Sequence, residues 1–375
     1  MKYTITAFLI FLFSLCGGYE ENIPESNDKN IYWNKIANRT IHSLIANYWN
    51  SQQHYFNYTN RGNPEFHYWP QAHALDILLD AYQRTKEDSL AQYMHHWYNG
   101  VKQQNGGSFY NIYYDDMQWN ALAMLRAYKT LGEDQFETAG RKLWKDIKTG
   151  WSDVAGGGIM WKKDTPNSKN ACSNGPAAIL AARLYRLEGD QSDLTWAKKI
   201  YEWEKNTLVD PSSGAVWDAA YVENDEVKIN KDWVFTYNQG TFVGAAVELY
   251  KITRESAYLK DAIKTADYTL DHLTKSNEDV LKYEGGGDGG LFKGIFVRYL
   301  TQLIQVQDLP DSARERYVSF LHHNAKVLWN KGTRKPEDIF GTYWGTKPED
   351  ETDLTTQLSG AMLIEALTVI RGSNM

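Results

Sequence analysis

The stretch DMQWNALAMLRAY, residues 116–128, decides the fold class, because polar residues open it and small or apolar residues then occupy every side of a predicted helix. Five segments of the same kind recur along the 375 residues. They are QAHALDILLDAY (71–82), GPAAILAARLY (175–185), QGTFVGAAVELY (239–250), GLFKGIFVRYL (290–300) and TTQLSGAMLIEAL (355–367). A helix that is apolar all round is a buried helix. The sequence therefore predicts six buried helices.

Segments with one apolar stripe and one charged face alternate with these six helices. They span residues 36–49, 88–99, 134–148, 191–206, 256–274 and 311–328. In the third, apolar positions recur at the spacing of a half-exposed helix, namely Phe136, Ala139, Gly140, Leu143, Trp144 and Ile147. Six buried helices alternating with six half-exposed ones predict an all-α (α/α)6 barrel of six inner and six outer helices. An open solenoid of helix pairs is the alternative.

The loops that precede the inner helices are rich in aromatic, acidic and glycine residues. They contain Trp69-Pro70, Tyr113-Tyr114-Asp115, Gly156–Gly158, Lys169-Asn170, Tyr237-Asn238 and Gly285–Asp288. Because each precedes an inner helix, we expect them to gather at one end of the barrel. Loops carry function more often than the elements that they join, so this end is the predicted active face.

Composition excludes several classes of protein. The formal net charge is −7 and no dense Lys/Arg run occurs, which argues against nucleic acid as a partner. The sequence has no HExxH, no GxSxG and no Cys/His group with metal-ligand spacing. The glycine clusters lack the GK[ST] of a phosphate-binding loop. We expect no metal and no cofactor.

The N-terminus resembles an export signal. Lys2 precedes an apolar run from Ile5 to Leu15 that is too short to span a bilayer. Cys16 follows directly, as at a bacterial lipoprotein processing site, although ordinary cleavage after Gly18 is the alternative. We therefore expect a signal peptide over 1–15, a polar tether over 16–30 and a single catalytic domain over 31–375. The expected location is the bacterial periplasm or cell surface, with the membrane touched only through a lipid on Cys16. Only one other cysteine, Cys172, exists, so no disulfide is expected.

The segment YYDDMQWN, residues 113–120, is the sharpest candidate for chemistry. Of two adjacent carboxyl groups beside aromatic rings, one can stay ionised while its neighbour is raised in pKa. This suits a nucleophile and an acid at Asp115 and Asp116. Helix capping by the same residues is the alternative, because aspartate is favoured at a helix N-terminus.

Several tryptophans stand at or near loop ends. Some are expected in the core, and others could stack on sugar rings, whose faces suit aromatic platforms. The set is Trp69, Trp119, Trp161, Trp217, Trp233 and Trp344.

Six segments together resemble glycoside hydrolase family 76, a family of endo-α-1,6-mannanases. They are YWPQAHALD (68–76), YYDDMQWNALA (113–123), GGGIMW (156–161), KNACSNGPAAILAARLY (169–185), FTYNQGTFVGAAVELY (235–250) and GDGGLFKGIFVRYL (287–300). They follow the order of the family and cover most of the chain after the signal. The family is similar in fold to the barrel that the helix pattern predicts.

The resemblance implies a retaining endo-α-1,6-mannanase that hydrolyses the α-1,6-mannose backbone of mannan by double displacement. It maps the nucleophile onto Asp115 and the general acid and base onto Asp116. It also makes candidates for substrate binding of Asn174, Gly175, Tyr237, Asn238, Gln239, Asp288 and Lys293. Trp69 and Trp119 join these candidates as aromatic platforms. For Asn238 and Gln239, helix capping is an equal alternative. Cys172 is interpreted as a small buried hydrophobe.

Two other functions stay open on the sequence. A transglycosylase would pass the same covalent intermediate to a sugar instead of water. A non-catalytic glycan-capture lipoprotein would bind mannan without shortening it, although such a protein has no need of two adjacent carboxylates. The charged faces of the outer helices indicate a monomer.

Overall fold

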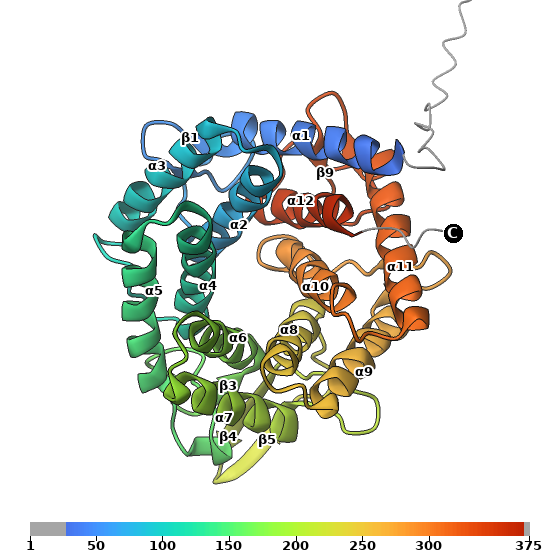
Figure 1. Cartoon of the computed structure of the whole chain (residues 1–375). Coiled ribbons are helices and arrows are strands. Elements are labelled where there is room, and N and C mark those ends of the chain that lie inside the picture. The colour runs from blue at the N-terminus through green and yellow to red at the C-terminus, as the bar shows by residue number, and fades with distance from the viewer. Residues whose placement is uncertain (1–27, 371–375) are drawn as a thin grey trace, which may run out of the picture.

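The computed structural model describes residues 28–370, in which twelve α-helices form two concentric rings (Figure 1). The inner ring consists of α2 (Tyr68–Thr85), α4 (Tyr114–Leu131), α6 (Ala171–Glu188), α8 (Thr236–Thr253), α10 (Gly289–Ile304) and α12 (Leu354–Val369). The outer ring consists of α1 (Asp28–Tyr48), α3 (Asp88–Gln104), α5 (Asp134–Ile147), α7 (Gln191–Leu208), α9 (Ser256–His272) and α11 (Asp311–Asn330). The predicted signal peptide and Cys16 lie outside the described residues.

The rings close on themselves. Each inner helix packs against the next along the chain, and α12 packs against both α2 and α1 (Figure 1). The predicted (α/α)6 barrel is therefore confirmed, and the open solenoid is wrong. None of the helices within residues 28–370 is long and apolar enough to cross a membrane.

Glycine lets neighbouring inner helices approach closely. A Cβ on Gly240 of α8 would lie 2.7 Å from the Cα of Phe296 on α10, and one on Gly294 of α10 would lie 2.6 Å from the Cα of Ser359 on α12. Both distances are shorter than carbon–carbon contact allows. Glycine is thus required at these two positions by the contact between backbones.

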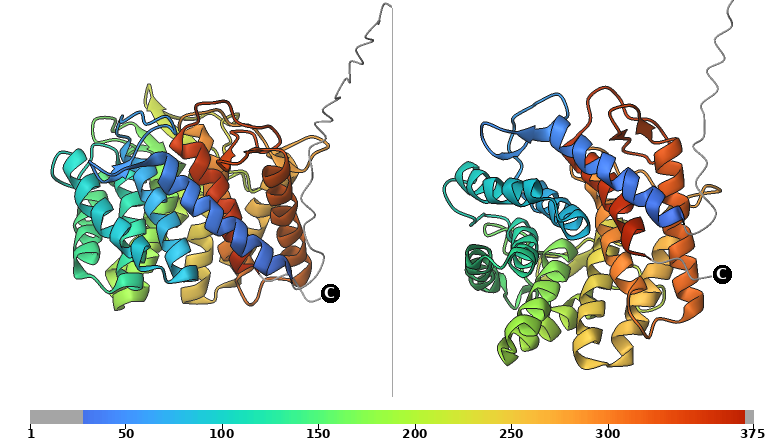
Figure 2. Two further views of the ribbon diagram at one scale, coloured as in Figure 1. Left: turned by 90° about the horizontal axis from the view of Figure 1, so that it is seen from above. Right: turned by 45° about the horizontal axis from the view of Figure 1, so that its top comes forward.

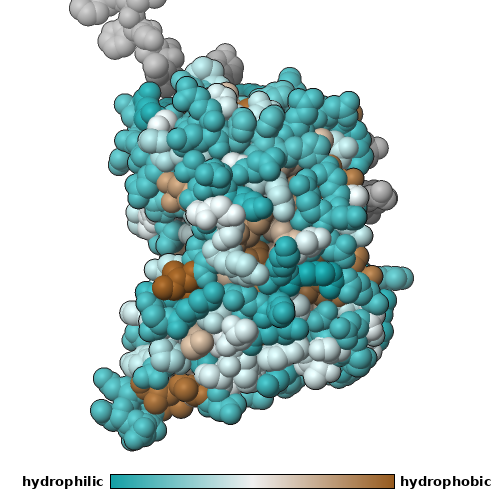
Figure 3. Space-filling model, turned by 90° about the vertical axis from the view of Figure 1, so that its left-hand side faces the viewer, coloured by the Kyte–Doolittle hydropathy of each residue, from teal (hydrophilic) through white to brown (hydrophobic). Residues whose placement is uncertain are grey.

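The outer helices keep the charged faces that the sequence predicts. The left-hand side of the molecule is mostly hydrophilic, and the brown, hydrophobic residues form small separate clusters (Figure 3). In α5 all six residues of the predicted apolar stripe are buried, Phe136, Ala139, Gly140, Leu143, Trp144 and Ile147.

Connections differ between the two ends of the barrel. Four of the turns from an inner to an outer helix are two residues long, and in each the inner helix ends on a left-handed residue, Lys86, Gly132, Gly189 or Arg254. Segments from an outer to an inner helix are much longer, and Figure 2 shows them together at one end. This is the end where the inner helices begin, as the sequence predicts.

Short β-strands, which the sequence analysis did not predict, organise these long connections. Antiparallel pairs join β1 (Trp49–Asn50) to β2 (Tyr55–Phe56), β6 (Thr274–Lys275) to β7 (Val280–Leu281), and β8 (Thr333–Arg334) to β9 (Ile339–Phe340). A three-stranded sheet has the order β3 (Ser168–Asn170), β4 (Ala219–Glu223) and β5 (Glu226–Ile229). Two 3-10 turns, Lys148–Gly150 and Val154–Gly156, lie before β3.

A recurring contact fixes the connections to the inner helices. Gln71 of α2 accepts from the Phe56 N–H at 2.9 Å and donates to the Phe56 carbonyl at 2.8 Å. The Gln239 side chain makes the same pair of bonds with Val216, both at 2.8 Å. We call this contact the carboxamide clamp. It occurs four times: Gln71 holds Phe56, Asn174 holds Ile159, Gln239 holds Val216, and Gln357 holds Asp338 and Phe340.

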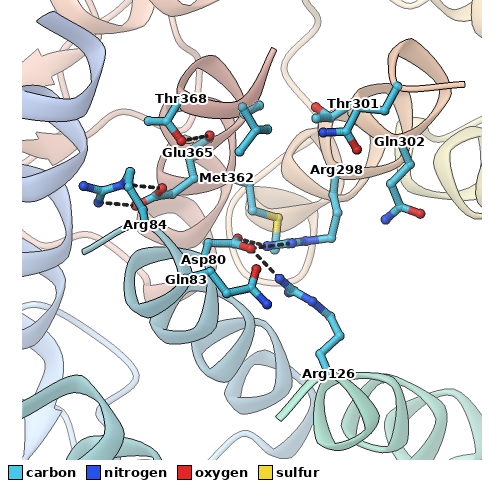
Figure 4. A pocket seen from close by; sticks show the side chains of 13 residues that line it. Asp80, Gln83, Arg84, Arg126, Arg298, Thr301, Gln302, Met362, Glu365 and Thr368 are labelled. Atoms are coloured by element: carbon cyan, nitrogen blue, oxygen red, sulfur yellow. Dashed lines mark hydrogen bonds and ion pairs between the residues drawn. The ribbon is translucent and has the colours of Figure 1, made fainter. Parts of the chain in front are cut away.

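Ion pairs fill the opposite end of the barrel, around a cavity of about 380 Å³ (Figure 4). Asp80 of α2 accepts from Arg126 of α4 at 2.5 Å and from Arg298 of α10 at 2.8 Å. Arg84 of α2 donates twice to Glu365 of α12, at 2.9 and 3.1 Å. Burial alone would raise the pKa of Asp80, but the two guanidinium groups outweigh it and hold this pKa below its ordinary value.

We expect Asp80→Asn to lower the free energy of unfolding by about 3 kcal/mol, because it leaves two largely buried guanidinium groups with Asp76 as their remaining carboxylate. Urea unfolding followed by circular dichroism measures this. The loss of stability should be full at neutral pH. It should shrink as the pH falls through the lowered pKa of Asp80, because Asp80 of the wild type then gains a proton and loses its charge.

Arg316→Ala is the matched control, because Arg316 pairs with Asp267 and Asp271 on the exposed surface. Its cost should stay below about 1 kcal/mol. An equal loss of unfolding free energy in the two variants would show that the ion pairs around Asp80 stabilise the barrel no more than an exposed surface pair does.

Candidate active site

Asp115 and Asp116 lie in the first turn of α4, at the end of the barrel that carries the long connections. Tyr113 precedes the helix as its N-cap and makes no side-chain capping bond. Both aspartates are half-buried. The helix therefore presents two consecutive carboxyl groups at the mouth of the barrel.

Asp115 rests against the neighbouring inner helix. The Cys172 thiol of α6 donates to its Oδ2 at 3.4 Å, while Oδ1 is buried with no hydrogen-bond partner in the described protein. Burial raises the pKa of Asp115 to about 7. The thiol, the N–H groups of residues 115 and 116, and Trp161 lower this pKa in turn, because polar groups favour the carboxylate.

The pKa of Asp116 is raised even more than that of Asp115. Burial raises its pKa well above the ordinary value, and the negative charges of Asp115 and then Asp288 add to this effect. The site thus favours one proton on the pair, held by Asp116, beside an Asp115 that ionises more easily. This division is what an acid and a nucleophile require.

A third carboxylate, Asp218, organises the start of α8. Its Oδ1 accepts from Asn238 at 2.8 Å and from the Tyr237 hydroxyl at 3.1 Å, and its Oδ2 from Asn170 at 3.4 Å. The Tyr237 ring stacks on Phe292 of α10, with centroids 3.9 Å apart. The Asn238 Oδ1 is buried and has no protein partner. Asp218 thereby fixes two of the predicted binding residues.

Trp69 and Asp288 meet at the rim, although 219 residues separate them in the chain. The indole N–H of Trp69 donates to Asp288 Oδ1 at 2.8 Å. Trp119 does not reach the surface: it is 4% exposed and packs on His73, which also contacts Trp69 edge-on. The Trp119 ring thus packs in the core beneath the rim, and its contact with a ligand stays a prediction.

Lys293 lies on α10 with a buried Nζ that has no hydrogen-bond partner in the described protein. Burial lowers its pKa to about 8, partly offset by the charge of Glu284. Trp344 places its ring centroid 5.7 Å from the Nζ. An unpartnered ammonium group at this depth is suited to a ligand oxygen.

Three other predicted binding residues have structural tasks instead. Asn174 and Gln239 are fully buried, and both ends of each carboxamide are used in the carboxamide clamp. Gly175 faces Thr241 of α8, whose Cβ would lie 2.7 Å from an added Cβ. Packing and loop anchoring account for these residue types, and their contact with a ligand stays a prediction.

Unpartnered buried polar atoms gather around the two aspartates. Among the described residues, those within the first two turns of inner helices are His73, Asp115, Gln118, Asn120, Asn238 and Lys293. Buried polar groups normally have a partner, so such a group of atoms at one mouth indicates a site for a ligand with many hydroxyl groups. Sequence analysis missed His73, Gln118 and Asn120; the signal was their spacing of one helical turn from Trp69, Asp115 and Asp116.

Metal binding finds no support in this region. Within residues 28–370 no three His, Cys, Asp or Glu side chains lie together as ligands of one ion. Acid–base and nucleophilic chemistry by carboxyl groups is what the arrangement offers.

Comparison with solved structures gives relatives along nearly the whole chain. The α-1,6-mannanase GH76A of Salegentibacter sp. HEL1_6 is 47% identical, with a TM-score of 0.87 over 90% of this chain and 99% of that one. The Lin0763 protein of Listeria innocua is 36% identical, with a TM-score of 0.82 over 89% of this chain and 96% of that one. A variant of the Salegentibacter enzyme with two adjacent aspartates changed to asparagine is described as inactive and in complex with α-1,6-mannotriose.

Among curated proteins, the mannan endo-1,6-alpha-mannosidase DCW1 of Saccharomyces cerevisiae is 27% identical over 231 residues, which are 56% of this chain and 50% of that one. The chain thus spans about half the length of the curated relatives that it matches first. The family model of glycosyl hydrolase family 76 matches residues 32–374. The chain belongs to glycoside hydrolase family 76.

Proposed function

We propose that this protein is a retaining endo-α-1,6-mannanase, which cuts the α-1,6-mannose backbone of mannan by double displacement. One observation carries the proposal: Asp115 and Asp116 stand side by side at the mouth of the barrel, and their surroundings favour a single proton on Asp116. The Salegentibacter relative supports the substrate, since its variant lacking two adjacent aspartates holds α-1,6-mannotriose.

In the first step Asp115 attacks the anomeric carbon while Asp116 gives its proton to the oxygen that leaves. Retaining enzymes use carboxyl groups about 5 to 5.5 Å apart, which neighbours on one helical turn can reach by splaying their side chains. The unpartnered Oδ1 of Asp115 is free to form the new bond. The products are a glycosyl ester on Asp115 and a shortened mannan chain.

The second step follows from the coupling of the pair. Forming the ester removes the negative charge of Asp115, which is one cause of the raised pKa of Asp116. The pKa of Asp116 therefore falls when the intermediate forms. Its carboxylate then takes a proton from the water that cleaves the ester, and the starting charges return.

Other groups around the pair are suited to hold sugar hydroxyls. The Tyr237 hydroxyl and the Asn238 amide are fixed by Asp218, so their remaining hydrogen-bonding capacity points in set directions. Lys293 supplies a cation, and Trp69 with Asp288 supplies an aromatic ring beside a carboxylate. These five residues are the proposed binding groups.

We expect the wild type to shorten unbranched α-1,6-mannan into oligosaccharides whose first-formed anomer is α, seen by early-time proton NMR. Asp115→Asn should abolish turnover, because no covalent intermediate forms. Asp116→Asn should lower kcat by roughly 10²- to 10⁴-fold, as loss of a general acid does.

Asp164→Asn is the matched control, because Asp164 is exposed and pairs only with Lys162; its rate should equal that of the wild type. A β anomer would contradict retention. Binding of mannan without shortening would identify a capture protein, and lengthened products with an added acceptor sugar would identify a transglycosylase.

The pH profile of kcat/KM should be bell-shaped. The rate should rise as Asp115 ionises, with a pKa of about 7, and fall at higher pH as Asp116 loses its proton. Asp116→Asn should remove the alkaline limb, measured with an α-1,6-mannobioside whose aryl leaving group needs no acid. An alkaline limb that survives in this variant would assign the proton to another group.

Export with a lipid on Cys16 is the proposed location, and it rests on the sequence pattern alone. The full chain, expressed in a bacterial host with radiolabelled palmitate, should incorporate label. Cys16→Ser should lose the label, whereas Cys172→Ser should keep it, because Cys172 is buried. Equal labelling of both variants would exclude Cys16 as the attachment site.

A further inference from the structure

Trp233 differs from every other tryptophan of the protein. Of the 14 tryptophans, all of which lie within the described residues, it alone is exposed, with 54% of its surface open to solvent. It makes no ring contact with its described neighbours, whereas Trp217, close by in the chain, is buried under Lys231. Exposure of so large an apolar ring is costly when nothing covers it.

The exposed aromatic residues share one place in the fold. Among the described residues they are Tyr110, Tyr221, Trp233 and Tyr283. Each lies in a connection from an outer to an inner helix, hence on the end that carries the aspartate pair. Exposed aromatic rings that collect on the face of a binding site indicate contact with a ligand more than chance does.

A short series of contacts joins Trp233 to the aspartates. The Trp233 carbonyl accepts from the Asp218 N–H at 2.9 Å, and the Asp218 carboxylate holds Tyr237. Tyr237 interacts electrostatically in turn with Cys172, whose thiol donates to Asp115. Trp233 therefore lies at the edge of the proposed catalytic mouth and not on a remote surface.

The backbone around Trp233 is fixed although its ring is exposed. Besides the bond to Asp218, its own N–H donates to the Asn230 carbonyl at 3.4 Å, and the Asn230 side chain accepts from the Asp232 N–H at 3.0 Å. A ring on a fixed backbone with two rotatable side-chain bonds loses little entropy when it binds.

We propose that Trp233 is a sugar-stacking platform that binds mannose units of the polysaccharide beyond those held at Asp115 and Asp116. The apolar face of a pyranose ring packs on an indole, and the indole N–H can donate to a hydroxyl group. Lys231 and Asp232, charged and exposed, flank the ring in the chain, so the apolar area is too small for a protein partner. The inference rests on the proposed function and assigns to Trp233 a preference for longer chains.

The test compares short and long ligands in the inactive Asp115→Asn/Asp116→Asn background. Calorimetry with α-1,6-mannotriose and α-1,6-mannohexaose measures binding without turnover. Adding Trp233→Ala should weaken binding of the hexaose by roughly three- to tenfold, the range of one aromatic contact, and leave the triose unchanged. Trp233→Phe should restore most of the affinity.

In the active protein, Trp233→Ala should raise KM for the polymer and leave kcat unchanged. Val227→Ala is the matched control, because Val227 is an exposed apolar residue of β5 without a ring, and it should change neither constant. The hexaose should also shift the tryptophan fluorescence of the inactive Asp115→Asn/Asp116→Asn protein, and adding Trp233→Phe should reduce that shift.

Unchanged binding of the hexaose by Trp233→Ala would overturn the platform and leave the proposed function intact. Equal weakening of triose and hexaose binding would also overturn it, because Trp233 would then affect the sugar units bound next to the aspartates. If the wild type neither cleaves nor binds any α-1,6-mannan ligand, the proposed function fails, and the platform for mannose fails with it.

Discussion

The long connections depend on one physical requirement: a backbone N–H or carbonyl that is buried must find a hydrogen-bond partner. Regular ladders cannot supply it here, because most strands are only two residues long. The carboxamide clamp supplies it instead. A glutamine or asparagine in the first turns of an inner helix offers a donor and an acceptor on one rigid plane, which matches the two groups of a residue in the preceding connection. Each clamp thus fixes a connection to the first turns of the inner helix that follows it. The clamps thereby position the loops around the candidate site.

With the connections fixed, the aspartate pair can be buried without collapsing into ion pairs. Asp115 has a thiol as its side-chain neighbour on α6, and Asp116 is raised in pKa by burial and by two negative charges, not lowered by a cation. A lysine or arginine beside Asp116 would stabilise its carboxylate and remove the proton that the proposed mechanism needs. The buried ammonium of Lys293 interacts with Glu284. The fold thus separates the cation from the acid by placing them on different inner helices.

The sequence was sufficient for the parts of the structure that repeat or form continuous motifs. Alternation of all-round apolar and one-sided helices predicted the number of helices and their order in the two rings, and the adjacent aspartates predicted the centre of the candidate site. Contacts between distant segments were not accessible in this way. Asn174, Gln239 and Gly175 belong to matching motifs, yet only their partners Ile159, Val216 and Thr241 reveal that they anchor loops or pack helices. The strands were not predicted, because strands of two residues are too short to show the alternation of apolar and polar residues that marks a strand.

The two ends of the barrel use polar residues in opposite ways. At the end opposite the aspartate pair, Asp80 accepts from Arg126 and Arg298, so these ion pairs tie three inner helices together and stabilise the ring. At the open end, Asp115, Asn238 and Lys293 keep buried atoms without partners, which costs stability in the free protein. A ligand rich in hydroxyl groups recovers that cost on binding, because each hydroxyl both donates and accepts. Stability and recognition are therefore assigned to opposite ends of the same six inner helices, and substitutions at one end need not disturb the other.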